Sequence, residues 1–363
     1  MRIAILGGGN GGHAMAADLA LRGHEVRMFE TQRFADRLGP TLRERRIVID
    51  GVGPKGEAVL RAVTTDPAEA VAGAELVVVV VPAFAQEVFF QAVMPHLESG
   101  QTVMVVAGDY GALRLRHLLS RQRPELRVKV GETNSLPYGA RLKAPGHVWV
   151  FALPEKDKHL VAACPASETQ EVLALWEELY PVSRGENVLA VALSNPNPTV
   201  HAAGSLLNTG RIQYSKGEFY LYREGITEAV ARVIRAVYEE QAAVGRAYGC
   251  QIATYRDRDF RTRSSIMGAC FWAPFDLDGL VGEIKGPSSV DNRYFTEDIP
   301  YGLVPASELA AKAQVRTPVI DALIDLGSVI CQRDFRKEGR TLSQLGLEEM
   351  DPQEIVEYLS IGG

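Results

Sequence analysis

The chain has 363 residues, of which 46% are hydrophobic, and its formal net charge at pH 7 is −6. This length predicts two domains, each able to bury its own core. The net negative charge argues against a general nucleic-acid-binding surface, so we expect small-molecule partners. The apolar run at residues 76–81 is far shorter than the ~20 residues of a membrane-spanning helix. The N-terminal residues predict a core strand rather than a secretion signal, so we expect a cytoplasmic protein that does not enter a membrane.

The cysteines argue against a metal centre. They are widely scattered and never form a CxxC pair, which disfavours both a zinc site and a redox dithiol. We therefore expect no metal, and thiols that are buried or idle in a reducing compartment. The four positions are Cys164, Cys250, Cys270 and Cys331.

A glycine-rich turn near the N-terminus is the most informative segment. The apolar strand at residues 3–6 precedes it, and an Ala/Leu-rich helical pattern follows it up to Arg22. Gly7 permits the sharp turn, Gly9 lets the backbone approach a phosphate, and Gly12 lets the helix pack closely on the strand. This context predicts a dinucleotide-binding unit.

The start of the helix offers a site for the pyrophosphate. Free backbone N–H groups and the positive end of the helix dipole meet the phosphates there. The alternative is a structural turn that binds no nucleotide. The candidate cofactor residues of the turn are Gly7, Gly9, Asn10, Gly11 and Gly12.

A carboxylate after the second strand predicts which dinucleotide binds. The strand Glu25–Phe29 is followed by Glu30, near the ~20-residue spacing typical of the acid that binds the adenosine ribose hydroxyls. A carboxylate there prefers a free 2′-hydroxyl to a 2′-phosphate, so we expect NAD. Arg33 leaves NADP open because it can swing toward a 2′-phosphate, unless it is simply a solvated arginine on the next helix.

The following segments alternate between strand and helix, which predicts a Rossmann-type doubly wound α/β sheet. Ligands of such sheets bind outside the carboxyl ends of the strands, so we expect residues 80–83, with Pro82 and Ala83 as contacts, and residues 106–109 to border the cofactor. The expected elements are a hairpin of residues 46–50 and 58–63, strands at 76–81, 101–106, 126–130 and 148–153, and helices at 84–97, 113–121 and 168–179.

The alternation breaks near residue 185. We place there the boundary between a dinucleotide-binding domain, residues 1–185, and a mainly α-helical catalytic domain, residues 186–363. In the second domain Thr227 predicts the N-cap of a long helix, and Thr317 with Pro318 begins another.

Catalytic groups are expected in the second domain, because the cofactor occupies the first. His201 follows Asn197 and Pro198, a predicted N-cap and first helical residue, which places it in the first turn of a new helix. A helix N-terminus disfavours the imidazolium, so a nearby carboxylate is needed to hold a proton on the ring. The residues alone leave a structural histidine as the other interpretation.

Residues 291–305 mix charged and aromatic side chains between prolines. Such a run is usually a solvated loop, but its aromatic residues favour an ordered loop, where function often resides.

Several segments along nearly the whole chain together indicate a family far more specifically than the glycine turn does. In these segments the chain resembles the opine dehydrogenase family, especially its bacterial N-(1-carboxyethyl)-norvaline dehydrogenase type. The segments are residues 7–14, 79–83, 131–133, 195–201, 224–227, 293–298, 302–305 and 334–342.

The resemblance implies an NAD(P)H-dependent enzyme that condenses an amino acid with a 2-oxo acid such as pyruvate and reduces the resulting imine, or runs the reverse oxidation. It also implies a homodimer. By the same resemblance His201 is the general acid/base, Asp298 pairs with it, and Arg293 holds a substrate carboxylate. These roles suit the chemistry, because a carboxylate favours and orients a charged imidazole and a guanidinium can bind both oxygens of a carboxylate.

The amino-acid side of the site stays open. Four arginines in one stretch are candidates for a second carboxylate or a solvated surface, and three other residues are candidates for the pocket or for the core. The arginines are Arg256, Arg258, Arg261 and Arg263, and the others are Tyr220, Tyr222 and Thr227.

Two rival functions remain. A reductase of a hydroxy acid or sugar phosphate, of the glycerol-3-phosphate or ketopantoate type, shares the two-domain plan but depends on a catalytic lysine. Lys216, Lys285 and Lys312 have no comparable setting in the sequence. A non-catalytic NAD(H)-binding regulator would need none of His201, Arg293 or the carboxylate partner.

Overall fold

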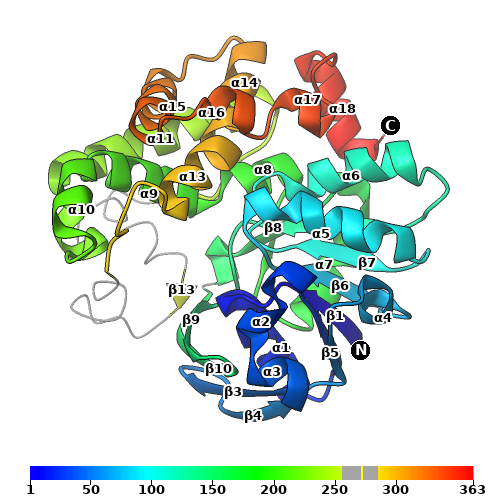
Figure 1. Cartoon of the computed structure of the whole chain (residues 1–363). Coiled ribbons are helices and arrows are strands. Elements are labelled where there is room, and N and C mark those ends of the chain that lie inside the picture. The colour runs from blue at the N-terminus through cyan, green and yellow to red at the C-terminus, as the bar shows by residue number, and fades with distance from the viewer. Residues whose placement is uncertain (155, 256–270, 273–284, 363) are drawn as a thin grey trace.

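The computed structural model describes residues 1–154, 156–255, 271–272 and 285–362. An N-terminal part built on a large β-sheet is followed by a mainly helical part, which gathers beside one end of the sheet (Figure 1).

In the described part of the chain, eight strands form the large sheet, in the order β12-β11-β8-β7-β6-β1-β2-β5. Neighbouring strands are parallel except β8 and β11, which are antiparallel. This confirms the doubly wound sheet. The strands are β1 (Arg2–Leu6), β2 (Glu25–Phe29), β5 (Ala62–Thr64), β6 (Leu76–Val79), β7 (Thr102–Val105), β8 (Lys129–Thr133), β11 (Leu160–Ala163) and β12 (Ser183–Arg184).

Helices cover both faces of this sheet, which is why β6 is apolar on both sides. Val77 and Val79 pack with residues of one set of helices, whereas Leu76 and Val78 pack with the other. The first set is α4 (Pro67–Val71), α5 (Gln86–Val93) and α6 (Gly111–Gln122), and the second is α1 (Asn10–Leu21) and α7 (Thr169–Glu177). Two short helices, α2 (Ala35–Leu38) and α3 (Pro40–Glu44), follow β2.

The strand order reverses at β1, which lies between β2 and β6. A crevice forms at such a switch point because the two following connections leave in opposite directions. The glycine turn after β1 therefore opens at the carboxyl edge of the sheet, beside the ends of β6 and β7.

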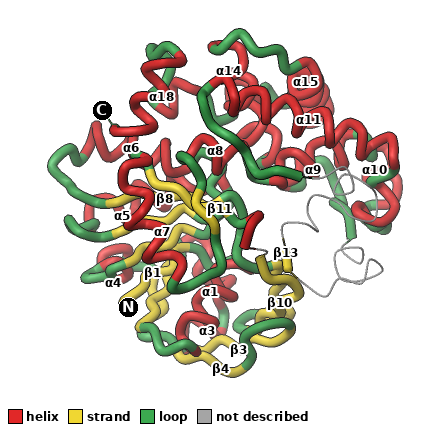
Figure 2. The backbone as a smooth tube through the Cα atoms, turned by 180° about the vertical axis from the view of Figure 1, so that it is seen from behind, coloured by secondary structure: helices red, strands yellow, loops and turns green. Residues whose placement is uncertain are grey.

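A second sheet lies over α1, as the view from behind shows (Figure 2). Its path is β13-β10-β3-β4, and β9 pairs with β10. The predicted strand at 148–153 belongs to it rather than to the large sheet, and so does the predicted hairpin except for its last residues. The strands are β3 (Arg46–Gly51), β4 (Gly56–Val59), β9 (Gly139–Ala144), β10 (His147–Pro154) and β13 (Phe271–Trp272).

Two predicted strands were wrong in their bounds. The strand expected at 58–63 is divided, because the chain leaves β4 in the second sheet and enters β5 at the edge of the large one. The strand expected at 126–130 is instead Lys129–Thr133, since buried Glu132 and Thr133 continue it where a charged residue usually marks a strand end. β11 was not predicted.

The helical part confirms one predicted cap and changes another. Thr227 caps α11 by accepting a hydrogen bond from the N–H of Val230, whereas Thr317 precedes α15 but bonds the Asp321 side chain instead. The helices are α8 (Val188–Leu193), α9 (Pro196–Leu206), α10 (Thr209–Ser215), α11 (Glu228–Ala247), α13 (Arg293–Thr296), α14 (Val304–Lys312), α15 (Pro318–Cys331), α16 (Phe335–Glu338), α17 (Leu342–Leu345) and α18 (Pro352–Ile361). In the ranges that the structure describes, no helix is long and apolar enough to cross a membrane.

Candidate active site

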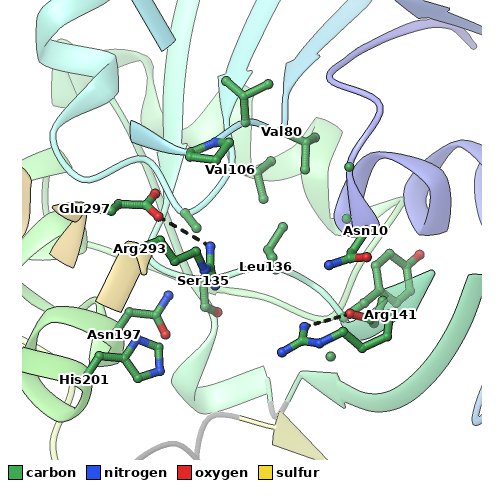
Figure 3. Close-up of a pocket in the computed structure, with 18 of the residues that line it drawn as sticks. Asn10, Val80, Val106, Ser135, Leu136, Arg141, Asn197, His201, Arg293 and Glu297 are labelled. Carbon is green, nitrogen blue, oxygen red and sulfur yellow. Dashed lines mark hydrogen bonds and ion pairs between the residues drawn. The ribbon is translucent and has the colours of Figure 1, made fainter. Parts of the chain in front are cut away.

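A cavity of about 350 Å³ lies between the sheet edge and the helical part (Figure 3). Its walls come from the glycine turn, the ends of β6 and β7, the β9–β10 pair and the helices α9 and α13. Of the predicted site residues, those that line it are Gly9, Asn10, Gly11, Pro82, His201 and Arg293.

The glycine turn has the geometry of a phosphate cradle. Gly7 has a φ of +116°, and a Cβ on Gly12 would lie 1.8 Å from the carbonyl oxygen of Gly7, so both positions require glycine. In the part of the chain that the structure describes, a Cβ on Gly9 would meet no atom within 4 Å, so there is room for a ligand beside the N-terminus of α1. These residues fit a dinucleotide pyrophosphate at the helix N-terminus.

Glu30 lies where the sequence predicts, directly after β2. Its carboxylate accepts hydrogen bonds from the backbone N–H of Gly8 at 2.9 Å and of Thr31 at 2.7 Å. The side chain is therefore fixed beside the glycine turn, and its contact with a ribose stays a prediction. Arg33 is exposed nearby.

The ends of β6 and β7 form another wall. Pro82 lines the cavity, whereas Ala83 is buried and donates its backbone N–H to Glu297 of the helical part at 2.8 Å. The residues after β7 in this wall are Val106, Ala107 and Asp109.

The loop after β7 is strained and is held from two sides. Ala107, Asp109 and Tyr110 all have positive φ, which is uncommon outside glycine and clusters at functional sites. Buried Glu132 accepts hydrogen bonds from the N–H groups of Tyr110 and Ala112. Buried Arg340, from the C-terminal part, donates to the carbonyl oxygen of Asp109. The loop is thereby fixed against the helical part at the cavity wall.

The helix that carries His201 begins earlier than predicted. Asn195, not Asn197, is the N-cap, and Pro196, not Pro198, is the first residue of α9, so His201 lies in the second turn. The Asn195 side chain accepts a hydrogen bond from the N–H of Asn197 and also donates to Asp109 at 2.6 Å. This second contact ties the start of α9 to the strained loop.

The structure brings His201 and Asp298 together. Nδ1 of His201 lies 2.8 Å from the Asp298 carboxylate, and both side chains are buried. Asp298 begins η8 (Asp298–Leu303), a π-helical turn, a feature that is frequent at functional sites.

Gly302 allows this approach, because a Cβ there would lie 2.2 Å from Pro198 of α9. We expect Gly302→Ala to push η8 away from α9. The overpacking should lower the free energy of unfolding by roughly 1–3 kcal/mol, and turnover should fall because Asp298 moves away from His201. Chemical denaturation and kcat measure both effects.

Gly210→Ala is the matched control for that substitution. It also adds one methyl group in a helix, but a Cβ at Gly210 meets no atom of the described residues within 4 Å. A Gly302→Ala variant as stable and active as Gly210→Ala would show that the close contact does not hold the pair.

Two tyrosines complete the surroundings of His201. Nε2 lies 2.7 Å from the hydroxyl of Tyr222, and the ring of Tyr294 stacks on the imidazole with centroids 3.7 Å apart. Both tyrosines line the cavity, whereas Tyr220 and Thr227 are not among its lining residues.

Burial governs the protonation of the pair. It lowers the pKa of His201 well below the usual value, with the charge of Arg293 as the next cause. It raises the pKa of Asp298 to about 7, against the effect of Arg293. Because burial disfavours extra charge on either group, the pair holds a single proton, between Nδ1 and the carboxylate.

Arg293 is the predicted anion anchor, and its guanidinium reaches the cavity half-exposed. Glu297, one helical turn later, lies 3.5 Å from it and is buried. Since the other oxygen of Glu297 accepts from Ala83, this carboxylate connects the anchor to the end of β6. Glu297 was not among the site residues predicted from the sequence.

Arg141 is a second cation that the sequence analysis missed. It enters the cavity from β9, on a different wall from Arg293 (Figure 3). The N–H of the next residue, Leu142, donates to the Asn10 side chain, which fixes this strand beside the glycine turn. The charge of Arg141 also lowers the pKa of His201, by less than Arg293 does, so both cations act on the same centre.

The predicted arginine cluster lies outside the described residues, as does Cys270. In the remainder of the chain, no three His, Cys, Asp or Glu side chains lie close enough to hold a metal ion. The cluster residues are Arg256, Arg258, Arg261 and Arg263.

Comparisons with known proteins agree with this architecture. Residues 2–109 match the model of the NAD-dependent glycerol-3-phosphate dehydrogenase N-terminus, and residues 184–331 match that of the NAD/NADP octopine/nopaline dehydrogenase α-helical domain. An octopine dehydrogenase solved with NADH and pyruvate shares the fold, with a TM-score of 0.71 at 22% identity over 96% of both chains.

Curated relatives extend over nearly the whole chain. The octopine dehydrogenase of Mizuhopecten yessoensis is 28% identical over 89% of this chain and 88% of its own. The opine dehydrogenase of Arthrobacter sp. (strain 1C) is 35% identical over 95% of this chain and 94% of its own. The chain therefore belongs to the opine dehydrogenase family, the NAD(P)-dependent oxidoreductases that act on CH–NH bonds.

Proposed function

We propose that the protein condenses an amino acid with a 2-oxo acid such as pyruvate, using NAD(P)H, with His201 and Asp298 as the acid/base pair. The observation that carries the proposal is one cavity that joins the glycine turn, a buried histidine–carboxylate pair and Arg293. In this proposal residues 1–185 hold the cofactor and residues 186–363 supply the acid/base.

Each group has a physical role in this reaction. Arg293 holds the carboxylate of the oxo acid through its planar fork, which places the adjacent carbonyl near His201. NADH, when bound along the glycine turn, supplies the hydride that reduces the imine. His201 exchanges the proton that accompanies loss of the carbonyl oxygen as water. Bound carboxylates offset the charges of Arg293 and Arg141 and so favour a proton on His201.

The second cation fits the second substrate. An opine carries two carboxylates joined through one secondary amine, and Arg141 and Arg293 reach the cavity from different walls. We infer that Arg293 takes the oxo acid, because its charge acts more strongly on His201, and that Arg141 takes the amino acid.

The rival reductase finds less support. No lysine is among the described residues that line the cavity, and Lys285 pairs with Glu218 at the surface. A non-catalytic regulator gives no reason for a buried His201–Asp298 pair at the same cavity.

The test is oxidation of NADH and NADPH with pyruvate against a panel of amino acids, each run with and without the amine. Amine-dependent oxidation supports opine formation and identifies the amino acid. Oxidation with the oxo acid alone points to a hydroxy-acid dehydrogenase, and no oxidation with any oxo acid supports the regulator.

Glu30 provides a test of cofactor choice. We expect Glu30→Ala to weaken NADH more than NADPH, because it removes an acceptor for the ribose hydroxyl and a repulsion of the 2′-phosphate. Since Glu30 also binds Gly8, the informative quantity is the ratio of the two dissociation constants. Arg33→Ala is the companion variant, and a larger loss of NADH affinity there than in Glu30→Ala would contradict the assignment.

The family resemblance also supports a cytoplasmic homodimer as part of this proposal. Analytical ultracentrifugation of the purified chain tests the dimer.

A further inference from the structure

Both ring nitrogens of His201 are already occupied. Nδ1 faces Asp298 at 2.8 Å, Nε2 faces the Tyr222 hydroxyl at 2.7 Å, and the residue is 2% exposed. If His201 is the acid/base, a proton can therefore reach the substrate only through Tyr222 or after the Tyr222 side chain moves away.

Packing fixes Tyr222 in its place. The residue lies in η6 (Leu221–Gly225), is 6% exposed and lines the cavity. Its hydroxyl is 3.5 Å from the hydroxyl of Tyr294, whose ring is stacked on His201. Nε2, the ring nitrogen that Asp298 does not bind, therefore faces a phenol that lines the same cavity and has neighbours that resist its displacement.

The hydrogen-bond donors can be assigned. Burial raises the pKa of Tyr222 well above its usual value, so the phenol keeps its proton. The nearest acceptor for that proton is Nε2, because the Tyr294 oxygen at 3.5 Å is too distant for a strong bond. Nε2 is therefore unprotonated, and Nδ1 donates to Asp298. The three groups form one hydrogen-bonded chain, and a second proton gained by the ring on Nε2 can pass along it to the phenol oxygen.

We propose that Tyr222 is the group that exchanges the proton with the substrate, and that His201 and Asp298 act behind it as a relay. The inference rests on the proposed function and names its terminal acid. In the dehydration step the Tyr222 proton passes to the oxygen of the carbinolamine, the C–O bond breaks, water leaves, and the nitrogen lone pair forms the C=N bond. The proton that reloads the phenolate comes from the amino acid, whose ammonium must lose a proton before it attacks the carbonyl. That proton passes through Tyr222 to Nε2 of His201, and after dehydration Nε2 returns it to the phenolate, so tyrosine ends neutral and His201 keeps only its Nδ1 proton.

Tyr222→Phe tests the relay, because it removes one oxygen and keeps the ring. We expect kcat to fall on the order of 10- to 100-fold, with KM for both substrates and the affinity for NADH within threefold of wild type. The double variant with His201→Ala should be no slower than His201→Ala alone, since both changes break one relay.

Tyr248→Phe is the matched control. Its hydroxyl is also buried and hydrogen-bonded, to the carbonyl oxygen of Leu309, away from the cavity, so its kcat should equal that of wild type. A Tyr222→Phe variant with wild-type kcat, or with a changed KM alone, would overturn the relay, as would losses that multiply in the double variant.

Two further outcomes are separable. If Tyr222→Phe does not bind NADH, 3-fluorotyrosine at position 222 replaces it as the test, because it keeps the hydroxyl and lowers its pKa; an unchanged kcat then overturns the proposal. If none of the amino acid and oxo acid pairs supports NADH oxidation by the wild-type protein, the proposed function itself is contradicted, before any variant is made.

Discussion

Replacing His201 with alanine is expected to lower turnover by roughly 10²- to 10⁴-fold, while the affinity for the cofactor stays near that of wild type. The loss follows from the proposed function, in which the buried His201–Asp298 pair supplies the proton and Nε2 faces Tyr222. Cofactor affinity is preserved because the glycine turn lies on a separate element. Steady-state kinetics and NADH fluorescence titration measure the two quantities.

His147→Ala is a matched control for that variant. His147 also pairs with a carboxylate, Asp50 at 2.7 Å, but the pair is at the surface on β3 and β10. Its loss should leave turnover unchanged. Wild-type turnover in His201→Ala would remove the acid/base assignment, and an equal loss in both variants would show that folding rather than chemistry is affected.

Arg293→Met is expected to lower kcat/KM for the oxo acid on the order of 10²- to 10⁴-fold, because each hydrogen bond to a charged group contributes about 1.5–3 kcal/mol and the guanidinium offers two. The methionine stem keeps much of the packing. Arg293→Lys should recover only part of the loss, since an ammonium lacks the planar fork. Varying pyruvate at saturating amine and NADH gives the values.

Arg235→Met is the control for Arg293→Met. Arg235 forms the same i,i+4 pair with a glutamate, Glu239 on α11, and it does not line the cavity. It should keep wild-type kinetics. If Arg293→Met changes the constants for the amine and leaves those for the oxo acid, then Arg293 binds the other carboxylate and Arg141 must take the oxo acid.

The nucleotide-binding half was predictable because its signals are local. The glycines before α1 and the apolar run of β6 are each a signal of a few neighbouring residues. In the helical part, the cap of α11 by Thr227 is local in the same way. The start of α9 was not predictable in the same way. Two successive pairs, Asn195–Pro196 and Asn197–Pro198, fit the pattern of an N-cap followed by a first helical proline equally well. The structure uses Asn195, whose side chain also bonds Asp109, a residue distant in sequence.

The missed parts of the site depend on contacts between distant segments. Glu132 is a buried carboxyl group inside β8, where it accepts hydrogen bonds from N–H groups at the start of α6. In the sequence, the alternation of polar and apolar residues predicts that Arg141 lies at the surface. Only the position of β9 beside the glycine turn brings Arg141 to the cavity. Tyr222 was a candidate for the pocket, but nothing in its neighbourhood along the chain indicates a bond to His201.

The most direct test of the account follows the transferred hydrogen. Wild-type protein is incubated with NADH deuterated at the transferred position, pyruvate and the amino acid that the panel identifies, and the products are analysed by mass spectrometry. The account predicts deuterium on the carbon that joins the two halves of an N-(carboxyalkyl) amino acid. Deuterium found only in lactate, with the amino acid unchanged, would contradict it.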